Sequence, residues 1–264
     1  MNYLIDSHCH IHDTDTYKFA LSRYPKLDLK DYQSEQLLQR AKEANIKQVI
    51  CVGTNHQDSF AARDFATQHD DVFWAYGIHP SEADSNTDEL EILNQTTGFS
   101  PIAIGEIGLD YHYQDTNPSA QIKLFEQLLQ LAQNQNLPVI FHVREAFDDF
   151  FAVLNNFSQI KHGVVHSFSD NQSNLDRILQ KTNFYIGVNG IATFANIPLP
   201  PLERMLLETD APFLSPHPYR NRPNEPAQIK TIAEFIAQKQ HLSLSQVVTQ
   251  TTKNTTTLFN LCYT

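Results

Sequence analysis

The sequence has few features of a membrane protein or of a disulfide-rich secreted protein. No apolar run approaches the roughly 20 residues that a transmembrane helix needs, so we expect no membrane association. The first residues lack a basic segment followed by an apolar one, so we expect no secretory signal and a cytoplasmic protein. Cys9, Cys51 and Cys262 are odd in number and lack CxxC spacing. They predict neither a disulfide framework nor a cysteine-based zinc site.

The motifs of several enzyme classes are also missing. There is no GxxxxGK[ST], no GxGxxG and no GxSxG in the chain, so nothing indicates a P-loop, a dinucleotide fold or a serine hydrolase. A net charge of −11 argues against a surface that attracts nucleic acid as a whole, because phosphates are bound mainly by Lys and Arg. Bound divalent cations can reverse the local electric field of a cleft. The net charge therefore does not exclude nucleic acid that binds at a metal site.

Short β-branched or aromatic segments alternate with longer amphipathic segments along the whole chain. Eight such strands with helical crossovers fit a single-domain (β/α)8 TIM barrel over residues 1–264, a fold of typically about 250 residues. A doubly wound open sheet is the competing architecture. The expected strands are 2–6, 46–53, 72–79, 100–106, 137–142, 162–166, 183–188 and 204–210. The expected helices are 34–45, 56–69, 119–135, 146–157 and 171–182, with closing helices within 225–240 and 243–261.

Polar residues of the metal-binding kind recur at or just beyond the ends of the expected strands. In a β/α barrel these ends meet at one face, so residues far apart in sequence converge there. The candidate ligands are His8, His10, Glu106, His142, His166 and Asp210, and His79 lies at a further strand end. A lone histidine at a strand end is more often a hydrogen-bonded structural residue, but such a series indicates a metal centre. The set suits two ions that share a bridging carboxylate, for which Glu106 is the best candidate, and it does not fix the metal.

Eight motifs occur in an order and at intervals typical of one family: DSHCH, GIHP, GEIGLDY, LPVIFHVREA, HSFS, GVNGIATF, ETDAPFL and PNEPA. On these motifs the chain resembles the TatD family of metal-dependent deoxyribonucleases, which are TIM-barrel metal-dependent hydrolases. The resemblance implies that His8 and His10 hold one ion, that His142 and His166 hold the other, and that Glu106 lies between them. It also implies that Asp210 binds metal and orients or deprotonates the attacking water.

The implied activity is hydrolysis of DNA phosphodiester bonds by a metal-activated water at a two-metal site. The expected cofactors are two divalent ions, magnesium in function, with manganese or zinc also possible for a histidine-rich site. DNA is the expected partner as substrate, and no obligate protein partner is evident. Candidate substrate contacts are His79, Arg144, Tyr111, Arg222 and Asn224. Each also has a structural interpretation, namely solvated arginines, rim packing for the tyrosine, and loop hydrogen bonds for the histidine and the asparagine.

Two segments depart from the family pattern. Residues 195–201 (ANIPLPP) stand where the family has a longer helical segment, and three prolines disfavour a helix there. We therefore expect a missing or shortened helix after the seventh strand and a barrel that could be open or repacked beside it. The first loop, residues 13–32, is longer than usual.

Two alternative functions stay open. One is a related barrel hydrolase acting on a small amide, lactone or phosphoester; such relatives commonly bridge their metals through a modified lysine at the place that Glu106 occupies. The other is a catalytically degenerate barrel that is used for binding.

Overall fold

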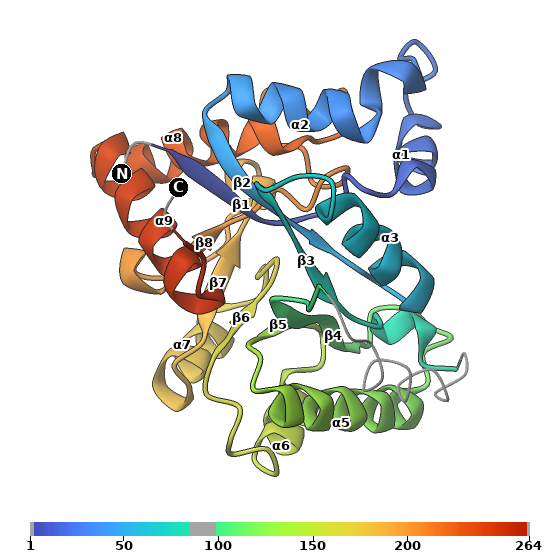
Figure 1. Ribbon diagram of the computed structural model, residues 1–264. Coiled ribbons are helices and arrows are strands. Elements are labelled where there is room, and N and C mark those ends of the chain that lie inside the picture. Colours follow the sequence, from blue (N-terminus) through green and yellow to red (C-terminus); the bar gives the residue numbers. More distant parts are fainter. Residues whose placement is uncertain (1–2, 85–98, 263–264) are drawn as a thin grey trace.

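The computed structural model describes residues 3–84 and 99–262. Eight parallel strands follow one another around the sheet in chain order, with helices outside them (Figure 1). This is the α/β barrel expected from the sequence rather than the open doubly wound sheet. Residue 2, at which the first strand was expected to begin, lies outside the described residues.

Each strand pairs in parallel with the next, and most strand residues are buried, because parallel strands in a barrel are covered on both faces. All eight lie within or close to the expected segments. They are β1 (Leu4–Cys9), β2 (Ile46–Val52), β3 (Val72–Tyr76), β4 (Ala103–Asp110), β5 (Val139–Arg144), β6 (Gly163–Val165), β7 (Tyr185–Val188) and β8 (Met205–Leu207).

The helices expected from amphipathic spacing are present, and a capping box at Ser243 begins the last of them. A short helix inside the long first loop, α1, was not predicted. The α-helices are α1 (Thr14–Leu21), α2 (Ser34–Glu43), α3 (His56–Ala66), α5 (Pro118–Gln135), α6 (Phe147–Leu154), α7 (Gln172–Lys181), α8 (Ile229–Lys239) and α9 (Leu244–Phe259). Among the described residues, none of the helices combines the length and the apolar character needed to cross a membrane.

The apolar core has two parts. The larger part packs the helices against the strands, and its rings include Phe125, Phe141 and Phe150. The smaller part joins residues of several strands, such as Ile50 and Val164, to the C-terminal end of α9. Apolar side chains thus occupy much of each strand, and polar side chains gather at the carboxyl ends, where a barrel builds its active site.

The connection from β7 to β8 lacks an α-helix, as the prolines predicted. Two short 3₁₀ helices stand there, η4 (Gly190–Thr193) and η5 (Leu202–Arg204). β7 nevertheless pairs in parallel with β8, so of the two possibilities the barrel is repacked beside β7 and not open there. An isolated bridge between Cys9 and Ala211 links the end of β1 to the segment after β8. Beyond β8, Asp210 N donates to His8 O at 2.9 Å and His10 N donates to Ala211 O at 2.8 Å.

A buried carboxyl group reinforces this link. Asp6 on β1 accepts hydrogen bonds from Thr209 N at 2.9 Å and from Thr209 Oγ1 at 2.5 Å. Asp6 therefore fixes the start of the HxH segment against the segment that carries Asp210.

The two C-terminal helices compensate for the missing crossover helix through side-chain amides. Asn254 on α9 is buried, and its Nδ2 donates to Leu202 O and to Met205 O, both at 2.8 Å. Gln240, just after α8, donates from Nε2 to Pro200 O at 3.0 Å. Side-chain amides thus pair backbone carbonyl groups of this connection and of the start of β8.

We expect Asn254→Ala to lower the free energy of unfolding by about 2 to 4 kcal/mol, because it leaves buried carbonyl groups without their donor. Urea unfolding followed by circular dichroism measures this change. Lys253→Ala is the matched control, because Lys253 is the exposed neighbour on the same helix and exposed substitutions usually change stability little. Equal unfolding midpoints for the two variants would contradict this role of Asn254.

Candidate metal centre

The two histidines of β1 point their Nε2 atoms at each other across 3.3 Å. Both side chains are buried, as alternate residues of a strand can be when they share one face. Nδ1 of His10 lies 2.8 Å from Val52 O, and it must donate there because a carbonyl oxygen only accepts. Neutral His10 therefore presents a lone pair on Nε2, which faces His8.

Two carboxylates approach this histidine pair. Glu106 on β4 places Oε2 3.5 Å from His8 Nε2. Asp210, just beyond β8, places Oδ1 3.4 Å from His10 Nε2 and 3.8 Å from His8 Nε2. The first donor group therefore consists of His8, His10 and Asp210, whose ligand atoms lie within 4.8 Å of one another.

A second donor group lies on the other side of the same glutamate. Glu106 Oε1 is 2.6 Å from His142 Nδ1 on β5 and 3.6 Å from His166 Nε2, just beyond β6. Glu106, His142 and His166 also bring ligand atoms within 4.8 Å of one another. The structure thus brings all six candidate ligands together, and the two oxygens of Glu106 face different groups.

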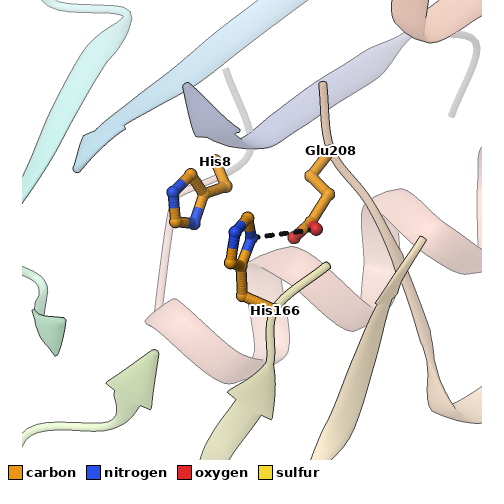
Figure 2. A group of neighbouring side chains, drawn as sticks. All are labelled: His8, His166 and Glu208. Atoms are coloured by element: carbon orange, nitrogen blue, oxygen red, sulfur yellow. Dashed lines mark ion pairs between the residues drawn. The ribbon is translucent and has the colours of Figure 1, made fainter. Parts of the chain in front are cut away.

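Two further carboxylates, which the sequence analysis did not single out, hold the second pair of histidines. Figure 2 shows the ring of His166 between His8 and Glu208, and Glu208 Oε1 lies 2.9 Å from His166 Nδ1. Asp110 Oδ2 lies 3.2 Å from His142 Nε2. A carboxylate on the second ring nitrogen fixes the orientation of a metal-binding histidine and increases its basicity. In each ring the other nitrogen is left to face Glu106.

Gly187 on β7 makes the room that Glu208 occupies. A Cβ atom added at Gly187 would lie 2.3 Å from Glu208 Oε2. Glu208 itself is buried, and its Oε1 also accepts a hydrogen bond of 2.6 Å from Ser167 N. The carboxylate is therefore held between two strands before any ion binds.

The charges of the centre compensate one another. Burial alone would raise the pKa of Glu106, but the imidazoles of His166, His142 and His8 hold this pKa well below its usual range. Burial alone would lower the pKa of His142, but Asp110 and Glu106 raise this pKa to about 9. Glu208 and Glu106 likewise outweigh burial and raise the pKa of His166 to about 10. Protons on the imidazoles thus supply the positive charge that the carboxylates need.

These residues fit divalent cations. Four imidazoles and two carboxylates converge from five strands, and imidazole with carboxylate oxygen is a donor set for zinc, manganese or iron. The Nε2 atoms of His8 and His10 face each other at 3.3 Å, and burial together with the charge of His166 lowers the pKa of His8. A cation placed between the two neutral rings would contact both Nε2 lone pairs.

His79 lies beside the centre. Its ring meets that of His142 edge to face, with centroids 4.5 Å apart. Its Nδ1 accepts a hydrogen bond from Ser81 N at 3.1 Å, so the neutral ring carries its proton on Nε2. Burial and the neighbouring His142 lower the pKa of His79 to about 4, so the ring is neutral at physiological pH.

Two expected substrate contacts are engaged elsewhere in the fold. Asn224 is fully buried, and its Nδ2 donates to Thr209 O at 2.8 Å, so it holds the loop that carries Asp210 and does not reach the cleft. Tyr111 is half-buried and donates from its hydroxyl to Asp149 at 2.9 Å.

The expected arginine contacts are exposed on the catalytic face. The guanidinium of Arg144 lies over the ring of Tyr113, 5.6 Å from its centroid. That of Arg222 lies over the ring of Tyr219 at 5.2 Å. Both side chains are exposed, so both are available to a ligand.

An eight-stranded barrel with this cluster at its strand ends has the architecture of a metal-dependent hydrolase. The model of the TatD related DNase family matches residues 5–260. The chain is 32% identical to an uncharacterized metal-dependent hydrolase, YabD of Bacillus subtilis, with 88% of this chain and 94% of YabD covered. It is 33% identical to the 3'-5' ssDNA/RNA exonuclease TatD of Erwinia tasmaniensis, with 86% and 93% covered.

A solved structure agrees with these sequence matches. The TatD homolog YJJV of Escherichia coli shares the fold with a TM-score of 0.81 and 27% identity, over 98% of each chain. The chain belongs to the TatD family of metal-dependent hydrolases.

We expect Glu208→Gln to weaken divalent metal binding by roughly 10- to 100-fold, because the amide no longer fixes and polarises the His166 ring. Isothermal titration with Mn²⁺ measures the change without any substrate. Glu203→Gln is the matched control, since Glu203 is exposed and lies in η5, directly before β8, whereas Glu208 directly follows β8. If both variants bind Mn²⁺ with the affinity of the parent protein, Glu208 does not orient a ligand.

We also expect metal affinity to fall as pH falls. Because the pKa values of His142 and His166 are raised to about 9 and about 10, both rings hold protons at neutral pH, and a cation must displace them. Each displaced proton weakens apparent affinity about tenfold per pH unit between about pH 6 and about pH 8. Titrations in buffers of different ionisation enthalpy count the released protons. An affinity independent of pH would contradict coordination by these imidazoles.

Proposed function

We propose that the protein is a divalent-metal-dependent deoxyribonuclease that hydrolyses phosphodiester bonds at a two-metal site. The observation that carries the proposal is the position of Glu106, whose two oxygens face two separate donor groups. A carboxylate placed in this way suits two ions that share one bridge. The exonuclease name of the Erwinia relative supports a single-stranded substrate attacked from its 3' end.

The residues of the chain would hold the ions as the two donor groups indicate. One ion would lie with His8, His10 and Asp210, the other with His142 and His166, and Glu106 would contact both. Bound divalent ions would lower the pKa of coordinated water and neutralise charge that develops on the phosphate.

Asp210 is suited to accept the proton of the attacking water. Burial alone would raise its pKa, but a hydrogen bond with His10 and the charges of His166 and His8 keep this pKa below the usual value. The carboxylate is therefore ionised at neutral pH and does not need a large shift to act as the local base. Its side chain is 14% exposed, which leaves it in contact with the cleft.

His79 is suited to contact the scissile phosphate. Its neutral ring carries the proton on Nε2, beside the second donor group, and a phosphate oxygen accepts such a bond. Arg144 and Arg222, exposed on the same face, could hold neighbouring phosphates by bidentate contacts.

We expect Glu106→Ala and Asp210→Ala each to lower cleavage of a 3'-labelled single-stranded oligonucleotide by roughly 100- to 10,000-fold. Each substitution removes a proposed metal ligand, and Asp210→Ala also removes the proposed base. Protein stripped of metal would be supplied separately with Mg²⁺, Mn²⁺ or Zn²⁺. The product ladder shows which end is attacked. Glu145→Gln is the control, because Glu145 is exposed on the rim and absent from both donor groups.

The contradicting result is specific. If the parent protein binds two ions and leaves the oligonucleotide intact with every metal, the site acts on another bond, and amide and lactone substrates should be tested.

A further inference from the structure

Several arginines of the catalytic face lie over exposed aromatic rings. Phe19 at the end of α1 is 59% exposed, and the guanidinium of Arg23 lies 5.7 Å from its ring centroid. Phe194, just after η4, is 39% exposed, and the guanidinium of Arg220 lies 3.8 Å from its ring centroid. We call these four residues, Phe19, Arg23, Phe194 and Arg220, the arginine–aromatic strip.

The strip is built from loops that follow three different strands, β1, β7 and β8, so it belongs to the carboxyl-terminal face of the barrel. Direct contacts join these loops. Tyr24, next to Arg23, donates from its hydroxyl to Arg220 O at 3.3 Å. His217 N donates to Thr193 Oγ1 at 2.9 Å, next to Phe194. Figure 1 likewise shows the orange segment after β8 beside the dark blue segment of α1.

Hydrogen bonds connect the same loops to the segment that carries Asp210. Tyr17 on α1 donates from its hydroxyl to Asn224 O at 3.0 Å, and Asn224 in turn holds Thr209, the neighbour of Asp210. The strip is therefore mounted on the two segments that continue from the HxH histidines and from Asp210. The first of these segments is the long first loop, and Phe194 lies directly before the connection that lacks a helix.

Another part of the same face is acidic. The loops after β5 and β6 line a cavity of about 460 Å³ with Glu145, Asp148, Asp149 and Asp170. Its one lining arginine, Arg177, is paired with Asp148 at 2.9 Å. A polyanion is repelled from this cavity, whereas arginines on the strip attract it.

We propose that single-stranded DNA leaves the metal centre over the arginine–aromatic strip, with bases stacked on Phe19 and Phe194 and phosphates held by Arg23 and Arg220. The proposal rests on the proposed nuclease function. Aromatic rings interleaved with arginines bind single strands because every base offers a face for stacking and every nucleotide a phosphate. Such a strip lets an acidic protein bind a polyanion locally. The strip acts on substrates long enough to reach it and does not act on the bond that is cut.

The test compares a long substrate with a short one. Cleavage of a dT12 oligonucleotide and of the dinucleotide dTpT would be measured for the parent protein and for two double variants. One variant combines Phe19→Ala with Phe194→Ala, and the other combines Arg23→Gln with Arg220→Gln. We expect each pair of substitutions to lower kcat/KM on dT12 by about tenfold or more, and to leave kcat/KM on dTpT unchanged. Phe19→Trp with Phe194→Trp should keep dT12 cleavage at the parent level. Arg63→Gln is the control, because Arg63 lies over Phe60 on α3, outside the strip.

A salt titration separates the two kinds of contact. Each arginine that contacts a phosphate contributes about 0.7 to the slope of log Kd against log salt concentration for a single strand. The Arg23→Gln, Arg220→Gln variant should therefore bind dT12 with a slope smaller by about 1.4, whereas the phenylalanine variant should keep the parent slope.

The outcomes distinguish the strip from the proposed function. If the parent protein cleaves both substrates and the strip variants cleave dT12 as well as the parent does, the nuclease function stands and the strip is overturned. If the parent protein cleaves neither substrate, the nuclease function fails. Binding of labelled dT12 in Ca²⁺, measured by fluorescence anisotropy, then tests the strip by itself. Weaker binding by the strip variants then supports the strip as a binding surface, and equal binding overturns it.

Discussion

The centre of the barrel depends on an ionised carboxylate, Glu106, buried among imidazoles. A charge that is 4% exposed is unfavourable unless opposite charges and hydrogen bonds compensate it. His8, His142 and His166 supply this compensation from three strands, at 3.5, 2.6 and 3.6 Å. The position of each ring therefore depends on the other strands being in register. The proposed two-metal centre rests on this one arrangement.

The barrel could be predicted from the sequence because its strands are short apolar runs and its helices have strong 3.6-residue periodicity. The missing helix before β8 followed from Pro198, Pro200 and Pro201. How the barrel closes could not be predicted, since it depends on long-range pairs such as Asp6 with Thr209 and on the reach of Asn254 from α9. The helix α1 has a weak apolar stripe, so its periodicity gave little signal in a loop of irregular composition.

The candidate ligands could be predicted because strand ends converge in any β/α barrel. Asp110 and Glu208 were missed, although alternate residues of a strand point to the same face. Asp110 is four residues after Glu106, and Glu208 is two residues before Asp210, so each pair shares a face. Their pairing with particular rings required the structure. The position of His12 could not be predicted either, because its ring is buried and bonds Asp58 at 2.9 Å. His12 lies beyond the end of β1, and whether such a residue is buried depends on the neighbouring helix, here α3.

Anomalous diffraction from crystals soaked in Mn²⁺ tests the central claim most directly, because it locates ions without any assumption about substrate. The account predicts two peaks, one beside His8 and His10 and one beside His142 and His166, with Glu106 between them. A single peak remote from Glu106, or no peak at ion concentrations that saturate binding in solution, would contradict the two-metal centre.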